Sequence, residues 1–311
     1  MALPPRYFVE LSELEIFRAV ALEQSVTRAA RSLDRVQSNV TTRVKQLEDS
    51  LGVSLFQRDS KKMLLTPEGH RLLGYADRLL ALAEEARQSM RGDAPSGRLR
   101  LGAMESSAAS RLPTPLGRFH AAWPDVDLVI QTGTTQTLVD AVLTHRLDCA
   151  VVAHPSTAAP GEADMAELGP GLDGTFLFTE TLMLVLPATH PDVRGAEDVR
   201  LRQLAAFAPG CTYRQCAETW LDNGAKTTAT GTPASARRAL SVVEMPSYHA
   251  MLASATAGAA AAILPQSLLA MHPQASELRA VPIRTVDTYL VKRAGFTSPA
   301  YEALLREFRT A

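Results

Sequence analysis

The pattern of apolar and polar positions between Val26 and Leu51 predicts two short helices joined by a polar turn. In each helix the apolar residues recur at steps of three and four, which gives one buried face. The first set is Val26, Ala29, Ala30 and Leu33, and the second is Val40, Val44, Leu47 and Leu51. The remaining faces of the second helix carry a run of amide, hydroxyl and cationic side chains.

That polar run has the chemistry of a surface that binds DNA. Amide and guanidinium groups recognise base edges, while hydroxyl groups and cations hold phosphates. The pattern therefore predicts a helix-turn-helix, and the alternative is an ordinary solvated helix face. The candidate DNA-facing residues are Gln37, Ser38, Thr41, Thr42 and Arg43. Among them, Gln37 and Arg43 are the expected base contacts, and Ser38 and Thr42 the expected phosphate contacts.

The flanking segments extend this prediction to a winged helix. Ser12 and Glu15 form a capping-box pattern that is expected to start a preceding helix. Ser25 is placed to cap the next helix, and Gly52 to end the recognition helix. A polar excursion at 57–62 has the size and charge of a wing. The cations expected to touch phosphates are Arg58, Lys61 and Lys62 on the wing. Arg28 and Arg31 on the first helix of the pair are further candidates, for which an ordinary surface position is the alternative.

A long amphipathic helix is predicted to follow. Thr66 is expected to cap it, and Pro67 takes its first position. Apolar residues then recur at alternating steps of four and three, a repeat that favours packing against a second copy of the helix. The alternative is packing on the chain's own body. The predicted dimerisation seam is Leu72, Ala76, Leu79, Ala83, Ala86 and Met90.

After a linker at 92–97, the pattern changes to strands alternating with helices, which predicts an α/β region with a parallel sheet. The expected strands are 98–103, 126–132, 148–153, 176–179, 182–186, 206–208, 240–244, 260–264, 278–283 and 287–292. The expected helices are 109–121, 135–145, 199–205, 213–223, 247–257 and 299–309. Two lobes of similar size are expected, with a ligand-binding cleft between them.

Four loops at strand ends supply candidate ligand contacts. Hydroxyl and N–H groups at a helix N-terminus favour an anion, and an arginine pairs a carboxylate bidentately. The expected effector is therefore a small molecule that bears a carboxylate. Ordinary helix capping is the alternative for the hydroxyl residues, and a structural role is the alternative for the histidine. The candidates are Ser106, Ser107, Thr134, Thr135, Cys211, Tyr213, Arg214 and His249.

Charge is unevenly distributed along the 311 residues, although the net charge is only −1. Between Val26 and Arg71 there are nine Lys and Arg against five Asp and Glu. From Ser96 onward the balance is eighteen against twenty. A basic module joined to a mildly acidic body agrees with DNA binding by one part only. The length suits two or three domains.

Three cysteines without metal-site spacing indicate reduced thiols and a cytoplasmic protein. No signal segment or membrane span is expected, and no metal or cofactor. Cys211 and Cys216 also permit a second hypothesis, a thiol-based redox sensor, for which simple packing is the alternative.

Catalytic motifs receive little support, so the protein is not expected to be an enzyme. Residues 169–174 match G-x-G-x-x-G by letter only, because no strand precedes them. A third hypothesis is nevertheless a ligand-binding protein or enzyme that its N-terminal helices merely dimerise.

Over nearly its whole length the sequence resembles the LysR-type transcriptional regulators. The motifs that carry this are LEIFRAV (14–20), TRAARSL (27–33), QSNVTTRVKQLEDSLGVSLFQR (37–58) and LTPEG (65–69). Weaker matches in the C-terminal region are RLRLGAMES, LDCAVVA and AAAAILPQSLL. The sequence departs from the family where Gln24 replaces a glycine and where Val36 replaces a capping serine, so that the cap is missing or supplied by Asp34. Thr41 and Thr42 replace Ser-Arg, with Arg43 beside them.

The resemblance implies a transcriptional activator or repressor. It would be a homodimer or a tetramer built from dimers, bind double-stranded DNA at a partly symmetric operator, respond to a small-molecule effector, and allow a contact with RNA polymerase. The expected domains are a winged helix-turn-helix at 1–66, a linker and dimerisation helix with its hinge at 67–95, and an effector-binding domain at 96–311. The last resembles a two-lobed periplasmic binding protein, with lobe I at 96–155 and 265–311 and lobe II at 156–264.

Overall fold

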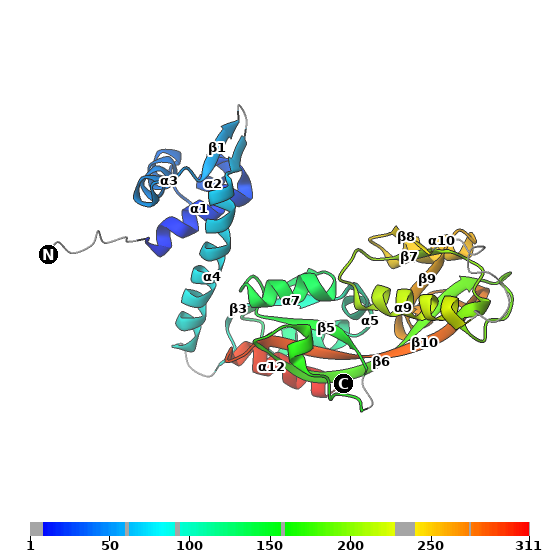
Figure 1. The fold of residues 1–311 in the computed structure, drawn as a ribbon. Coiled ribbons are helices and arrows are strands. Elements are labelled where there is room, and N and C mark those ends of the chain that lie inside the picture. The colour runs from blue at the N-terminus through cyan, green and yellow to red at the C-terminus, as the bar shows by residue number, and fades with distance from the viewer. Residues whose placement is uncertain are drawn as a thin grey trace. The chain divides into compact units, whose positions relative to one another are not determined.

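The computed structural model describes residues 9–59, 62–90, 94–156, 159–227, 240–273 and 275–310 (Figure 1). Contacts divide the chain into two compact units, and the boundary between them in the sequence lies near residue 92. The N-terminal unit contains the predicted winged helix and the long helix that follows it. The second unit contains the α/β region.

The N-terminal unit is a helix-turn-helix with a two-stranded wing. Its elements are α1 (Leu11–Glu23), α2 (Val26–Ser32), α3 (Gln37–Leu51), β1 (Phe56–Asp59), β2 (Lys62–Leu65) and α4 (Pro67–Ser89). The apolar stripes converge on one core, in which Phe17, Val40 and Leu47 are fully buried. The strands of the wing are antiparallel, with Phe56 opposite Leu65. The winged helix-turn-helix prediction is therefore confirmed.

The helix ends follow the sequence signals with one exception. The Ser25 hydroxyl accepts a hydrogen bond from the N–H of Arg28, and Gly52 ends α3 with a φ of 69°. The capping box predicted for Ser12 and Glu15 is wrong. Glu10 is the N-cap, and its N–H donates to Glu13 Oε2 at 3.2 Å, so that α1 begins at Leu11, one residue earlier. The Ser12 hydroxyl donates to the Glu10 carboxylate instead.

The second unit is built on one eight-stranded sheet in the order β4-β3-β5-β10-β6-β9-β7-β8 (Figure 1). The strands are β3 (Gly97–Ala103), β4 (Val126–Thr132), β5 (Cys149–Pro155), β6 (Leu172–Pro187), β7 (Gln203–Ala206), β8 (Ser241–Glu244), β9 (Ala261–Pro265) and β10 (Leu278–Arg293). The helices are α5 (Glu105–Ser110), α6 (Pro113–Ala122), α7 (Thr135–Leu143), α8 (Met165–Leu168), α9 (Thr212–Thr227), α10 (Tyr248–Thr256), α11 (Gln266–Ala270) and α12 (Pro299–Arg309), with short 3-10 turns at Ala196–Asp198 and Ala275–Glu277.

The sheet is mixed rather than purely parallel. At one end β3 is parallel to β4 and β5, and at the other β7 is parallel to β8 and β9. Between these ends β10 runs antiparallel to both β5 and β6, and β6 runs antiparallel to β9. The long strands β6 and β10 therefore connect two parallel three-stranded groups, which are the cores of the two lobes.

Two pairs of predicted strands are in fact single long strands. The polar residues Glu180 and Thr181 suggest a break in β6, but the Glu180 carboxylate lies 2.9 Å from the Arg111 guanidinium and its strand continues. In β10 the pairing shifts at Pro282, which has no N–H for the ladder, and the strand also continues.

Two predicted helices differ in the structure. The helix expected at 199–205 is absent, since its residues enter β7 after the 3-10 turn. The helix expected at 109–121 is two helices, α5 and α6, separated by Arg111 and Leu112. Pro113 takes the first position of α6, where its missing N–H is tolerated, so a new helix starts there.

The lobes share part of their hydrophobic core. One buried cluster fills lobe I around Leu101, Phe119 and Tyr301, and another fills lobe II around Leu252 and Leu264. A third, larger cluster runs under α7 and α9 from β5 to β7. Since β6 and β10 pass through both lobes, the expected boundaries at residues 156 and 265 do not divide the chain cleanly into lobes.

Candidate DNA-binding surface and effector pocket

The exposed face of α3 is polar and largely uncommitted. It consists of Gln37, Ser38, Asn39, Thr41, Thr42 and Lys45, all of them exposed. Within the described part of the chain, the side chains of Ser38, Thr42 and Lys45 make no hydrogen bond or ion pair. Such free donors and acceptors on one short helix suit base edges and phosphates.

Two members of this face are held in place by neighbours. Gln37 Oε1 accepts a hydrogen bond from the Thr27 hydroxyl at 3.1 Å, which orients the amide and leaves its NH₂ group outward. The Thr41 hydroxyl donates to the carbonyl of Gln37 at 3.0 Å and is therefore partly used within the helix. The N-cap of α3 is Val36, and no side chain caps this helix. Of the two alternatives expected from the sequence, the cap is therefore missing rather than supplied by Asp34.

Arg43 and Arg28 lie differently from the expectation. The Arg43 guanidinium is 3.8 Å from Glu10 and 3.9 Å from Glu13, so it links α3 to the start of α1. Arg28 is paired with the carboxylate of Glu23 at 3.1 Å and also donates to its carbonyl. Both arginines thus have partners inside the unit, and neither is a free cation on the DNA-facing surface.

The wing presents Lys62 as an exposed cation. Lys61 and the side chain of Arg58 lie outside the described residues. The wing is positioned by Glu48, which sequence reasoning did not select. The Glu48 carboxylate accepts the N–H groups of Leu55 and Phe56 at 2.7 and 3.2 Å, and fixes the wing to α3. Glu48 stands within the motifs that carry the family resemblance, as does Gly69, where an added Cβ would meet the carbonyl oxygen of Leu55 at 2.2 Å.

The predicted seam on α4 divides between two faces. Ala76 is fully buried in the core of its own unit, and Leu72 packs against that core. Leu79, Ala86 and Met90 are exposed, while Ala83 is half-buried. The continuous exposed apolar row in the single chain is Tyr75, Leu79, Leu82 and Ala86, which keeps the alternating steps of four and three. Packing on the chain's own body therefore accounts for the first part of the predicted seam.

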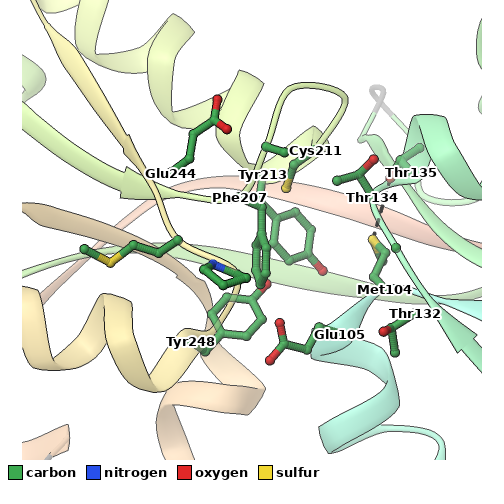
Figure 2. A pocket seen from close by; sticks show the side chains of 14 residues that line it. Met104, Glu105, Thr132, Thr134, Thr135, Phe207, Cys211, Tyr213, Glu244 and Tyr248 are labelled. Atoms are coloured by element: carbon green, nitrogen blue, oxygen red, sulfur yellow. Dashed lines mark hydrogen bonds between the residues drawn. The ribbon is translucent and has the colours of Figure 1, made fainter. Parts of the chain in front are cut away.

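In the second unit, a pocket of about 380 Å³ lies between the two lobes (Figure 2). It is lined by Met104, Glu105, Thr132, Gly133, Thr134, Thr135, Phe207, Ala208, Cys211, Tyr213, Glu244, Met245, Pro246 and Tyr248. Its walls are mostly aromatic rings, methionines and small apolar groups. That size and that lining are typical of sites for small organic ligands.

The sequence identified part of this lining. Thr134, Thr135, Cys211 and Tyr213 face the pocket as expected. Ser106 and Ser107 are buried behind it. The Ser106 hydroxyl donates to Tyr213 Oη at 3.4 Å, while the Ser107 carbonyl accepts the N–H of Arg111.

Arg214 and His249 do not line the pocket. The Arg214 guanidinium is held by Glu218 at 2.9 Å and Glu244 at 3.0 Å, and it donates to the carbonyl of Phe207. His249 is exposed, and its ring lies 6.2 Å from that of His272. The proposed pairing of Arg214 with a ligand carboxylate is therefore not favoured, since its charge is already matched.

Backbone donors of α7 are already used across the pocket. The N–H of Gln136 donates to the carbonyl of Gly210 in the opposite lobe at 3.2 Å, and that of Thr137 donates to Thr134 Oγ1. The Thr212 hydroxyl also donates to Thr135 Oγ1 at 3.0 Å. The bonds between Gln136 and Gly210 and between Thr212 and Thr135 join the two lobes, and all three leave fewer donors for an anion.

Some backbone donors in the first turns of α9 and α10 are used in a similar way. The sulfur of Cys211 accepts the N–H groups of Tyr213 and Arg214, and the carboxylate of Glu105 accepts the N–H of Tyr248. Glu105 begins α5 in lobe I and Tyr248 begins α10 in lobe II, so this last bond also joins the lobes.

Burial controls the charge of the pocket's acidic groups. Desolvation raises the pKa of Glu105, although the N–H of Tyr248 and the nearby His249 act in the opposite direction. Burial also raises the pKa of the Tyr213 and Tyr248 phenols, which stay protonated and available as hydrogen-bond donors. Sequence reasoning placed Glu105 and Tyr248 in the right turns but did not select them. It missed Phe207 and Glu244, which no motif marks.

The thiols show no sign of activation. Cys211 and Cys216 are both buried, and burial raises the pKa of each thiol. Reactive cysteines need a lowered pKa and access to solvent. The redox hypothesis is therefore not favoured by the structure.

Neither a metal site nor a membrane span has a candidate in the described part of the chain. The described residues contain no group of three His, Cys, Asp or Glu side chains arranged to hold a metal ion. Among the helices so described, none is long and apolar enough to cross a membrane.

Comparisons with known proteins agree with this division of the chain. Residues 11–70 match the model of bacterial regulatory helix-turn-helix proteins of the lysR family, and residues 92–311 match the LysR substrate binding domain. The chain is 32% identical over 302 residues to the HTH-type transcriptional regulator GltR of Bacillus subtilis, covering 95% of each chain. It is 31% identical over 310 residues to the regulator YusT of the same organism, covering 96% of this chain and 95% of the other.

Solved structures share the fold. A full-length OxyR variant from Pseudomonas aeruginosa superimposes with a TM-score of 0.67 at 24% identity, covering 97% of this chain and 95% of that one. CbnR complexed with its target DNA gives a TM-score of 0.62 at 23% identity, with 97% and 99% covered. With both domain models matched in order, the chain belongs to the LysR family of DNA-binding transcriptional regulators, with an N-terminal helix-turn-helix and a C-terminal effector-binding domain.

Proposed function

We propose that the protein binds a partly symmetric operator through the exposed face of α3, as a dimer, and that a small molecule in the pocket between the lobes controls this binding. The observation that carries the proposal is the uncommitted polar face of α3, with Gln37 oriented by Thr27 and with free hydroxyl and ammonium groups beside it. A helix of this kind in the major groove recognises bases with its N-terminal residues.

The roles within α3 follow from these contacts. Gln37 is the proposed base contact, because its amide is oriented and exposed. Ser38, Thr42 and Lys45 are the proposed phosphate contacts, with Thr41 in a lesser role and Lys62 reaching the backbone from the wing. Arg43 is proposed to hold α3 against α1 rather than to contact a base. Arg58 and Lys61 remain proposed phosphate contacts on the basis of the sequence alone, and Arg28 has at most a lesser role because it pairs with Glu23.

The dimer is proposed to form along the exposed row of α4. A single helix surface with Tyr75, Leu79 and Leu82 in water is costly, and a second copy would cover it. Two copies of α3 would then face DNA at half-sites about one helical turn, or a multiple of it, apart. Tetramer formation, a contact with RNA polymerase and a cytoplasmic location agree with the family and remain proposals.

The experiment is selection of binding sequences from a random duplex library. Wild-type protein is expected to enrich a partly two-fold sequence. Replacing Gln37 by alanine should lower the preference at one position in each half-site by about 1–3 kcal/mol, whereas Arg43→Ala should preserve the selected sequence. Gln131→Ala, at an exposed glutamine on β4, is the matched control. Failure of the wild type to enrich any sequence would contradict the proposal.

A further inference from the structure

The charged groups that line the pocket indicate which chemical class of ligand it accepts. Two carboxylates line it, those of Glu105 and Glu244, and no Lys or Arg is among its lining residues. The inference below rests on the proposed function, in so far as it takes this pocket to be the effector site.

The two carboxylates are not equivalent. Glu244 is more than half exposed at 55% of its side chain, and Arg214 neutralises it at 3.0 Å. Glu105 has no Lys or Arg partner within the described part of the chain, and only the N–H of Tyr248 and the neighbouring His249 stabilise its charge. A desolvated carboxylate without a cation favours a positively charged ligand group.

Aromatic rings stand beside Glu105. Figure 2 shows the side chains of Phe207, Tyr213 and Tyr248 together, with the Glu105 carboxylate close to Tyr248. The rings of Phe207 and Tyr248 pack edge to face, with centroids 4.8 Å apart. Aromatic faces attract ammonium groups, and they also cover the apolar part of a ligand. Met104 and Met245 add soft, adaptable walls.

An anion finds fewer partners in the same space. Several donors at the start of α7, α9 and α10 are taken, by Gly210 and Thr134, by Cys211, and by Glu105 itself. A ligand carboxylate would have to displace these bonds and would approach the unmatched charge of Glu105.

We propose that the pocket binds an organic ammonium ion with an apolar or aromatic body, its charged nitrogen on Glu105 and its body against Phe207, Tyr213 and Tyr248. This replaces the carboxylate-bearing effector expected from the sequence. The ligand would also couple to the arrangement of the lobes, because Glu105 holds the N-terminus of α10 across the pocket.

The test is calorimetric titration of the full chain with two matched pairs of probes. Phenethylamine and hydrocinnamate share one body, hexylamine and heptanoate another, and within each pair only the charge differs. At least one amine is expected to bind with a dissociation constant of roughly 1 mM or lower. Neither carboxylate is expected to bind at the same concentration. Glu105→Gln should weaken amine binding about tenfold or more, because the ion pair is lost.

The controls keep other outcomes distinct. Glu162→Gln removes an exposed carboxylate away from the pocket and should leave amine binding unchanged. The circular dichroism melt of Glu105→Gln shows whether that variant is folded. Binding of a carboxylate in preference to its amine would overturn the inference, and so would the absence of binding by both amines. Sequence selection by the unliganded protein, measured in parallel, tests the proposed function separately.

Discussion

The exposed face of α3 and the pocket between the lobes differ in how far their polar groups are hydrogen-bonded within the protein. On the face of α3, the side chains of Ser38, Thr42 and Lys45 have no partners in the described part of the chain, which agrees with their proposed role as DNA contacts. In the pocket several polar groups are already bonded within the protein, as with Thr135, whose hydroxyl accepts a hydrogen bond from Thr212 of the other lobe at 3.0 Å. The surface proposed to bind DNA therefore has unpaired polar side chains. The pocket instead has one carboxylate without a Lys or Arg partner among the described residues, that of Glu105, which the proposed ligand would neutralise.

The difference also shows what each site depends on. The α3 face belongs to one helix, so its chemistry is intact wherever that helix is folded and presented. The pocket draws its walls from turns after β3, β4, β7 and β8, and exists only while the lobes hold their positions. Changes that act on one region and not on the other test this comparison.

The largest effect is expected from charges placed on the exposed row of α4. Replacing Leu79 and Leu82 together by aspartate should abolish the dimer, because burying each leucine there contributes about 1.5–3 kcal/mol. Light scattering after gel filtration measures the mass. Leu22→Asp, at an exposed leucine of α1, is the control that should stay dimeric. A dimer that persists in the double variant would refute the assignment of this row.

A smaller effect is expected from Gly69→Ala. The added Cβ would approach the Leu55 carbonyl oxygen to 2.2 Å, so α4 or the wing must shift, at a cost of about 2–3 kcal/mol. Gly74→Ala on the same helix meets nothing within 4 Å and should instead stabilise the unit slightly. Thermal melts compare the two variants. Ligand binding by the second unit should survive Gly69→Ala; its loss would show that the regions are not separable.

The smallest effect concerns pH and the second unit alone. Asp287 is fully buried and accepts hydrogen bonds from Ser156, Thr179 and the N–H of Gly161 at 2.8, 2.7 and 2.9 Å. Desolvation acts to raise its pKa, but these bonds, together with His154 nearby, lower it below the ordinary value. The ionised form is therefore favoured in the folded state.

The sign of the pH effect follows. Because the folded pKa lies below the unfolded one of about 3.9, the stabilisation is fully present above that value and is lost as the pH falls through the folded pKa. Asp287→Asn should cost about 1–2 kcal/mol near neutral pH and remove this part of the acid sensitivity. Melts of both proteins between neutral and acidic pH measure it. An unchanged acid dependence in the variant would contradict the role of Asp287.

Much of the N-terminal unit could be predicted from sequence because its signals are local. The stripe of Val40, Val44 and Leu47 is buried as the spacing indicates, and Ser25 and Gly52 end their helices as their residue types favour. The seam on α4 was harder. A repeat of four and three fits two adjacent faces of a helix that also carries Leu73 and Leu80, and only tertiary packing shows that Ala76 belongs to the core.

The pocket was only partly predictable, because its charge balance depends on partners distant in sequence. Arg214 follows a strand and starts a helix, like a ligand contact, yet Glu244, thirty residues later, neutralises it. Glu105 stood in the right turn, but its unmatched charge is visible only when α10 and its neighbours are in place. Local patterns identified the loops, and the fold determined the chemistry that they present.

The most direct test of the account is cleavage of selected DNA by an iron chelate attached to α3. Ser38→Cys places an exposed thiol on that helix, while the native cysteines are buried and have raised pKa values. The account predicts two cleavage centres, about ten base pairs or a multiple of that apart, at the two half-sites. Absent cleavage, or the same pattern from a chelate on Asp222→Cys in the second unit, would contradict the claim that α3 binds DNA.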